Sequence, residues 1–334
     1  MKGLPLLIPV LFMAFIALGL AQPKTVAVGL VFSIAILWGI HRGTKVEWED
    51  VGLDIEEKYI VLAFWAAIAI IIIQILNFRS IPLINPAIRT SLNPQLTALT
   101  YFLGVPSSVY LFLRGKKYSL IYPIAVTLYA YRTPVLVSLL AVGAAYYEET
   151  RESGRLKVLH ISVLVVGLLV LGLGMTFLRG ETAAGLLTRV QSSTSVLDII
   201  VWRAGWKGLY HGYLQWTGIS SYIIGGYSPR GLVAKFLYVH NGVTITPTLL
   251  GGMYLDFGVF AILEGFLLGL YYGLIQKAIH PVTKALYYST LAYGIVGVET
   301  GILDLPVYLL FAMGAYIVIH GWKAAKREGS GVAE

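Results

Sequence analysis

The sequence predicts an all-helical, polytopic membrane protein, and three observations support that fold class. Of its 334 residues, 57% are hydrophobic and only 13% are charged, and the mean hydropathy is +0.76. Several apolar runs reach the ~20 residues that a membrane-crossing helix needs. Basic residues gather in the connections between alternate runs. The apolar/polar alternation of a membrane β-barrel is absent.

About ten apolar runs are expected to form membrane helices. The expected spans are 4–21, 25–40, 59–78, 96–113, 118–131, 134–147, 158–178, 247–276, 285–301 and 303–322. The segment "ALGLAQP" resembles a signal-peptide cleavage site after Ala21, but an uncleaved helix is favoured in a chain with so many spans. Residues 1–334 are expected to form a single membrane domain with one large loop at 179–245. The loop is expected to contain amphipathic helices.

The basic clusters set the expected orientation. With the N-terminus in the cytoplasm, every compact cluster falls on the cytoplasmic side, as the positive-inside rule requires. The clusters are Arg42 and Lys45; Arg114, Lys116 and Lys117; Arg151, Arg155 and Lys157; Lys277 and Lys284; and Lys323, Lys326 and Arg327. The chain is therefore expected to be a multi-pass protein of the cytoplasmic membrane, with both termini in the cytoplasm and loop 179–245 outside.

The run 118–147 carries a single charge, Arg132, within "LYAYRTPVLVSLL". Basic clusters that should both be cytoplasmic flank this run, so its thirty residues must cross outward and return. A limb of about 14 residues rises only ~21 Å, less than the ~30 Å hydrocarbon core. Arg132 is therefore expected at a turn between two short helices, below the outer surface. Such an arginine indicates a functional site, although snorkelling or an ion pair would also accommodate it.

The outer loop is unusually basic and aromatic. Loop 179–245 holds six cations against two acids, which suits either lipid phosphates or a cavity for a dianion. Within 196–218, Arg203, Lys207 and His211 are spaced four apart and would form one stripe on a helix. The aromatic residues bordering that stripe are Trp202, Trp206, Tyr210 and Tyr213. An interfacial helix and a sugar-binding wall both fit this pattern.

Further charges lie near the same membrane face. Arg230 is expected at the tip of a turn-rich loop, 225–238. Asp256 would lie ~14 Å into the helix that begins near Pro247, where it could neutralise Arg132 or act as a general base. Glu299 and Asp304 would lie at the final outer turn.

Three stretches together resemble the oligosaccharide repeat unit polymerases, the Wzy-type O-antigen polymerase group. They are "FRSIPLINPAIRTSLNP" (78–94), "YAYRTPVLVSLL" (129–140) and "TITPTLLGGMYLDFGVFAILEGFLLGLYYGL" (244–274). The third is the most specific, with Thr-Pro-Thr, a glycine and Tyr-x-Asp-Phe-Gly. The resemblance implies a GT-C-like membrane glycosyltransferase that joins lipid-linked oligosaccharide units on the outer membrane face.

That chemistry assigns candidate roles to the residues. Arginine forks suit the polyprenyl or dolichyl (pyro)phosphate leaving group. The candidate phosphate ligands are Arg132, Arg203 and Arg230, followed by Arg89, Lys207 and Lys235. The candidate general bases are His240, His211 and Asp256. The candidate glycan contacts are Trp202, Trp206, Tyr210 and Tyr254.

The substrate partners expected are a polyprenyl- or dolichyl-linked oligosaccharide and membrane lipid, with no nucleic acid. No cofactor or metal is expected, because no glycine-rich phosphate loop follows a strand and the six histidines are scattered. With no cysteine in the chain, disulfides and cysteine nucleophiles are excluded. The alternatives are a transporter or flippase for an anionic lipid-linked substrate, an O-antigen-ligase-like transferase, and a non-catalytic lipid-binding scaffold.

Overall fold

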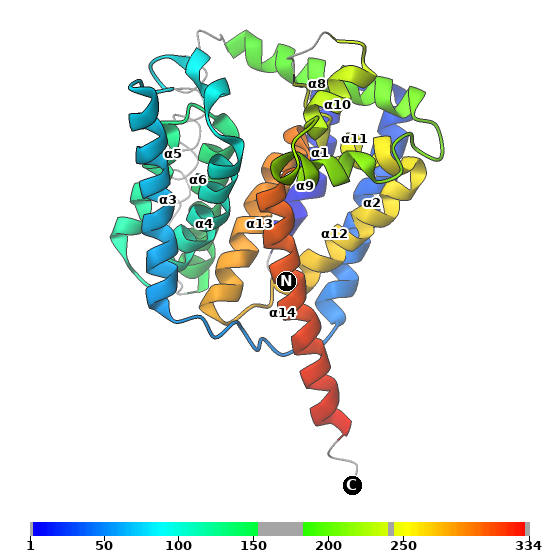
Figure 1. Ribbon diagram of the computed structural model, residues 1–334. Coiled ribbons are helices and arrows are strands. Elements are labelled where there is room, and N and C mark those ends of the chain that lie inside the picture. Colours follow the sequence, from blue (N-terminus) through cyan, green and yellow to red (C-terminus); the bar gives the residue numbers. More distant parts are fainter. Residues whose placement is uncertain (1–2, 153–182, 240–243, 331–334) are drawn as a thin grey trace.

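The computed structural model describes residues 3–152, 183–239 and 244–330, and within them every regular element is a helix. The helices form two bundles (Figure 1). The first comprises α3 (Glu57–Phe78), α4 (Pro94–Leu113), α5 (Ile121–Thr127) and α6 (Arg132–Glu152). The second comprises α1 (Leu7–Leu18), α2 (Pro23–Lys45), α8 (Ala183–Arg203), α9 (Tyr213–Ile223), α10 (Pro229–Phe236), α11 (Thr248–Phe257) and α12 (Ala261–Ile275). Helices α13 (Pro281–Thr300) and α14 (Leu305–Ser330) lie between them and join the two bundles.

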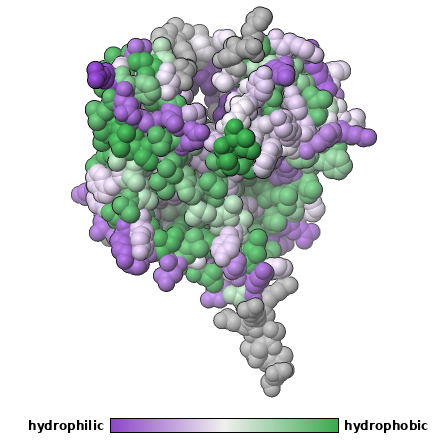
Figure 2. Space-filling view, viewed as in Figure 1, coloured by the Kyte–Doolittle hydropathy of each residue, from purple (hydrophilic) through white to green (hydrophobic). Residues whose placement is uncertain are grey.

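The two ends of the molecule differ. Helices α8, α9 and α10 lie at the top of Figure 1, and we call this the loop end. Segment 46–56 and the last turns of α14 lie at the bottom, and we call this the tail end. Figure 2 shows hydrophobic residues over the middle of this face and hydrophilic residues toward both ends, as a membrane protein requires.

Five helices are long and apolar enough to cross a membrane within the described residues. They are Pro23–Lys45, Glu57–Phe78, Pro94–Leu113, Thr248–Ile275 and Leu305–Ala324. The chain is therefore a multi-pass membrane protein. Each expected span has a helical counterpart except 158–178, which lies outside the described residues.

Helices α2 (Pro23–Lys45) and α12 (Ala261–Ile275) cross with their backbones in contact. A Cβ atom at Gly39 would lie 2.1 Å from the carbonyl oxygen of Phe266, and one at Gly269 would lie 2.1 Å from that of Ile36. Each helix has glycines four residues apart, which allow this close approach between membrane helices. They are Gly39 and Gly43 on α2, and Gly265, Gly269 and Gly273 on α12. The short α1 (Leu7–Leu18), entered through the 3₁₀ turn η1 (Leu4–Leu6), packs against α2.

The first bundle contains α3 (Glu57–Phe78), α4 (Pro94–Leu113), α5 (Ile121–Thr127) and α6 (Arg132–Glu152). A 3₁₀ turn, η2 (Pro86–Ser91), precedes α4, and another, η3 (Lys117–Leu120), precedes α5. The outward limb is short, as predicted, but the prediction of a short return limb is wrong. Helix α6 has 21 residues and rises ~31 Å, enough to cross the hydrocarbon core. It continues past 147 because Glu148 is buried against α13, where it accepts a hydrogen bond from the hydroxyl of Tyr288.

Helices α13 (Pro281–Thr300) and α14 (Leu305–Ser330) are joined by a tight turn. Gly301 has a φ of +75°, a left-handed backbone conformation that glycine adopts without strain. At the tail end, Asp50 Oδ2 accepts hydrogen bonds of 2.7 Å from the backbone N–H groups of Ile279 and His280, just before α13. This contact ties segment 46–56 to the helix that joins the two bundles.

The span expected at 247–276 is broken. Helix α11 (Thr248–Phe257) ends at Gly258, where φ is +57°, and the 3₁₀ turn η4 (Gly258–Phe260) leads into α12. Segment 204–212 packs against the break, because the N–H groups of Leu209 and Tyr210 donate to the carbonyl of Leu255. The loop chain thus satisfies backbone groups that the break would leave without partners.

The loop end carries α8 (Ala183–Arg203), α9 (Tyr213–Ile223) and α10 (Pro229–Phe236). The basic stripe predicted across Arg203, Lys207 and His211 does not form, because α8 ends at Arg203 and α9 starts only at Tyr213. Glycines at positive φ turn the intervening chain: Gly205, Gly208 and Gly212.

Candidate functional site

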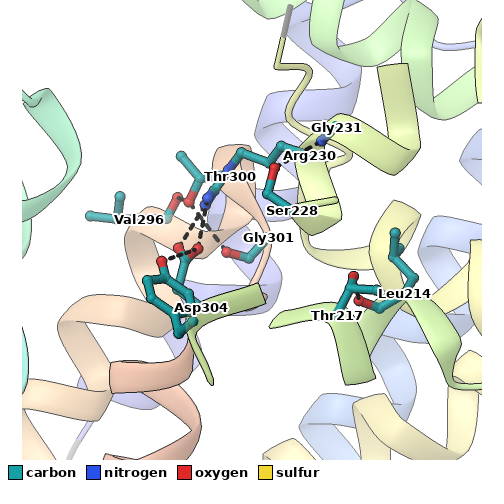
Figure 3. Close-up of polar contacts among 10 residues, drawn as sticks. Leu214, Thr217, Ser228, Arg230, Gly231, Val296, Thr300, Gly301 and Asp304 are labelled. Atoms are coloured by element: carbon teal, nitrogen blue, oxygen red, sulfur yellow. Dashed lines mark hydrogen bonds and ion pairs between the residues drawn. The ribbon is translucent and has the colours of Figure 1, made fainter. Parts of the chain in front are cut away.

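An ion pair between Arg230 and Asp304 lies where the loop end meets the joining helices (Figure 3). The guanidinium donates two parallel hydrogen bonds of 2.8 Å, one to each carboxylate oxygen. The two side chains are 22% and 23% exposed. This geometry is the bidentate fork with which arginine binds planar anions, and solvent can still reach it.

Local sequence explains how each partner is positioned. Pro229 starts α10, and Ser228 Oγ accepts a 3.1 Å hydrogen bond from the N–H of Gly231, so Arg230 is held on the first turn of a short capped helix. Asp304 ends the turn that begins at Gly301 and immediately precedes α14. The pair therefore links the loop end to the helices that join the two bundles.

A third group completes the contact. The hydroxyl of Tyr222, on α9, donates to Asp304 Oδ1 over 3.5 Å. Burial raises the pKa of Tyr222, the charge of Asp304 raises it further, and Arg230 acts in the opposite direction. For Arg230, burial would lower the pKa, but the charge and hydrogen bonds of Asp304 raise it above its ordinary value. Tyr222 therefore stays neutral and Arg230 stays charged.

Two further tyrosines lie near this contact, and a third, Tyr101, lies within electrostatic range of one of them, Tyr293. Tyr293 and Tyr308 lie within electrostatic range of Asp304. The hydroxyls of Tyr101, Tyr293 and Tyr308 are buried and have no hydrogen-bond partner among the described residues.

Arg132 approaches the same region from the first bundle. It is half-buried and is the first residue of α6. The preceding residue, Tyr131, donates its hydroxyl to the carbonyl oxygen of Arg89 over 2.9 Å and lies within electrostatic range of Tyr222. Tyr131 thus places the start of α6 near Tyr222 of α9. Figure 2 shows the surface hollowed between the bundles at the loop end, with hydrophilic residues at the rim.

The other predicted cations lie on the surface. Arg203 is exposed, 6.0 Å from the ring centre of Tyr238, and Lys235 is exposed, 5.2 Å from that of Tyr227. Lys207 is exposed as well. Their exposure sets these three side chains apart from the half-buried Arg230–Asp304 pair.

The four predicted glycan-contact residues also differ in their exposure. Trp202 and Trp206 are 61% and 78% exposed, and Trp202 Nε1 donates to Gln22 Oε1 over 2.6 Å. Tyr210 is half-buried in the segment packed on the helix break. Tyr254 is buried on α11 and forms part of the apolar core.

Asp256 is fully buried, and both its oxygens are engaged at the start of α9. Oδ1 accepts a 2.9 Å hydrogen bond from the N–H of Leu214, and Oδ2 accepts one of 2.9 Å from the N–H of Gln215. The backbone carbonyl of Asp256 accepts the N–H of His211, whose side chain is exposed. This geometry favours a helix-capping role for Asp256 over a general base. His240 lies outside the described residues.

Asp304 was expected near the outer mouth without an assigned role, and neither Tyr222 nor Tyr131 stood out in the sequence. One signal in the sequence could have identified Asp304: acids are few among the segments expected on the outer side. In the structure, two of these acids pair with cations, Glu299 with Arg189 and Asp304 with Arg230. Within the described residues, no three His, Asp or Glu side chains gather as a metal ion would require.

The family described as "Putative O-antigen polymerase" matches residues 1–311. An uncharacterised protein of Methanocaldococcus jannaschii is 30% identical over 292 residues, which cover 82% of this chain and 80% of that protein. No solved structure matches the chain.

Proposed function

Because the chain belongs to the O-antigen polymerase family, we propose that it is a membrane glycosyltransferase that polymerises lipid-linked oligosaccharide repeat units. The donor is an oligosaccharide on a polyprenyl or dolichyl (pyro)phosphate. The acceptor hydroxyl of a second lipid-linked glycan attacks the anomeric carbon of the donor. The bond from that carbon to the phosphate oxygen breaks, and the lipid (pyro)phosphate leaves with the electron pair.

The observation that carries this proposal is the bidentate hold of Arg230 on a carboxylate at a solvent-reachable position. The same fork fits two oxygens of a phosphate. A fixed cation in a poorly hydrated site stabilises the charge that develops on a leaving group without any metal. Arg132, with Arg89 on the neighbouring turn, supplies further positive charge from the opposite bundle.

The remaining cations are assigned a different role. Arg203, Lys207 and Lys235 are exposed at the loop end, where they attract the anionic lipid carrier to the site. The exposed Trp202 and Trp206 contact the glycan or the membrane interface. His211 and His240 are general-base candidates, whereas Asp256 stabilises the start of α9.

The tail end faces the cytoplasm in this proposal, because the basic clusters in the connections between helices lie there. The loop end, with the Arg230–Asp304 pair, then faces the outside. Lipid-linked glycans that have been flipped across the membrane would meet the site on that side.

Polymerisation by the purified protein in nanodiscs tests the proposal. With polyprenyl- or dolichyl-pyrophosphate-linked oligosaccharide as substrate, the wild type should give a glycan ladder on a gel. Arg132→Ala and Arg132→Lys should each lower polymer yield, the alanine variant by ~100-fold, because an ammonium group cannot form the bidentate contact.

Arg42→Lys provides the matched control, because Arg42 is exposed at the end of α2, far along the helix from the loop end. It should polymerise like the wild type. A ladder unchanged in Arg132→Ala would remove Arg132 from the site. A single transfer to a different acceptor, without a ladder, would identify a ligase instead.

A further inference from the structure

We propose that Asp304 is the general base of the transfer reaction and that donor binding releases it from Arg230. The inference rests on the proposed function. Arg230 offers one fork, and the carboxylate of Asp304 occupies both of its donating positions. A donor phosphate needs the same two positions, so phosphate and carboxylate compete for Arg230.

The carboxylate of Asp304 becomes available when it loses that competition. In the ion pair, the guanidinium of Arg230 donates to both of its oxygens. Once Arg230 turns to the phosphate, those oxygens can accept a hydrogen bond from a hydroxyl group. Of its present contacts the Tyr222 hydroxyl, 3.5 Å away, would remain to orient the carboxylate. The freed carboxylate then lies beside the bound donor, where it can meet the acceptor hydroxyl.

The step balances in atoms and electrons. The acceptor O–H gives its proton to a carboxylate oxygen of Asp304, and the acceptor oxygen forms a bond to the anomeric carbon. The bond between that carbon and the phosphate oxygen breaks, and its electron pair goes to the phosphate, which Arg230 holds. When the lipid (pyro)phosphate leaves, Asp304 passes its proton to water and Arg230 recaptures the carboxylate. Acceptor activation therefore depends on a bound donor.

The setting of Asp304 distinguishes it from Asp256, the base candidate that the sequence suggested. Asp256 is fully buried and bound by two backbone N–H groups that cannot leave without disrupting α9. Asp304 is 23% exposed and is held by a flexible side chain that a ligand can attract. Only the second arrangement can release a carboxylate during a reaction cycle.

Two variants in nanodiscs separate this role from a structural one. Asp304→Asn should polymerise at least ~100-fold more slowly, the range for loss of general-base catalysis. It should nevertheless bind a fluorescent lipid-pyrophosphate donor as tightly as the wild type or more tightly, since its Arg230 is free. Arg230→Gln should lose donor affinity and polymerisation together.

A purely structural ion pair would give a different pattern, because Asp304→Asn would then lower donor affinity and thermal stability together. That result, or polymer yield within tenfold of the wild type, would overturn the proposal. If the wild type makes no ladder, the proposed function fails. Donor binding still tests whether phosphate and Asp304 compete for Arg230, because Asp304→Asn should keep or raise donor affinity and Arg230→Gln should lower it.

A labelling experiment on the wild type avoids any folding defect. Excess carbodiimide with glycine ethyl ester modifies accessible carboxyl groups, and mass spectrometry locates them. Adding geranyl pyrophosphate should raise labelling of Asp304 severalfold and leave exposed Asp54 unchanged. No change at Asp304, at concentrations where the compound displaces the fluorescent donor, would show that phosphate does not release the carboxylate.

Discussion

At the residue scale, Asp256 shows how one buried carboxylate positions a distant site. It binds the first turn of α9, and α9 carries Tyr222 to Asp304 at its other end. Asp256→Ala would leave two buried N–H groups without partners, at ~1–3 kcal/mol each. We expect a fall in the unfolding temperature and loss of polymerisation. Thermal unfolding in detergent, with exposed Asp54→Ala as control, measures the first effect.

The variant Asp256→Asn distinguishes a role of Asp256 in capping α9 from a role as catalytic base. The amide oxygen still accepts one N–H, so stability should lie between those of the wild type and the alanine variant, and polymer yield should follow stability. If Asp256→Asn unfolds like the wild type but polymerises a hundredfold more slowly, Asp256 would be the base after all and Asp304 would not.

Only part of the role of these residues could be predicted from the sequence. It singled out Arg132 because one charge in a thirty-residue apolar run stands out. It could not distinguish Asp256 from Asp304, because burial and hydrogen-bond partners decide their roles and both depend on contacts between distant segments. It also grouped Arg203 and Lys207 with Arg230, since spacing alone does not reveal where a helix ends.

At the element scale, the crossing of α2 and α12 depends on the absence of side chains. Gly269→Ala would place a methyl group 2.1 Å from the carbonyl oxygen of Ile36, a backbone atom that cannot move without shifting the helix. Overpacking of this kind destabilises by ~1–3 kcal/mol or more. We expect a lower unfolding temperature and reduced polymerisation, because α12 continues from the break that segment 204–212 packs against.

The same single-methyl change at Gly3 provides the control. A Cβ atom there would meet no atom within 4 Å, so Gly3→Ala should unfold like the wild type. If Gly269→Ala were equally stable, the two helices would separate more easily than their contact indicates.

Helices were easier to predict than their interruptions. Apolar runs identified the helical segments, because each must satisfy its own backbone hydrogen bonds in lipid. The break at Gly258 was missed, since it depends on chain 204–212, about fifty residues earlier, which supplies the partners for the interrupted backbone. Likewise, α6 extends past 147 because Glu148 is buried and accepts a 2.8 Å hydrogen bond from the hydroxyl of Tyr288 on α13.

At the scale of the whole molecule, the two bundles meet through α13 and α14, and the candidate site lies at that junction. Arg230 and Tyr222 come from the second bundle, Asp304 from the joining helices, and Arg132 from the first bundle. A reaction between two lipid-linked chains needs access for two substrates, and a site between two bundles provides approaches from more than one side. This arrangement explains why the groups lie far apart in sequence.

The orientation of the molecule gives the final prediction. The chain contains no cysteine, so a single introduced cysteine reports one position. Ser195 is exposed on α8 at the loop end, and Lys45 is exposed at the tail end of α2. On intact cells, a membrane-impermeant maleimide should label Ser195→Cys and not Lys45→Cys, because the basic connections stay in the cytoplasm. After permeabilisation both should react. The reverse pattern would place Arg230 and Asp304 on the cytoplasmic side, where a polymerase of flipped lipid-linked glycans could not work.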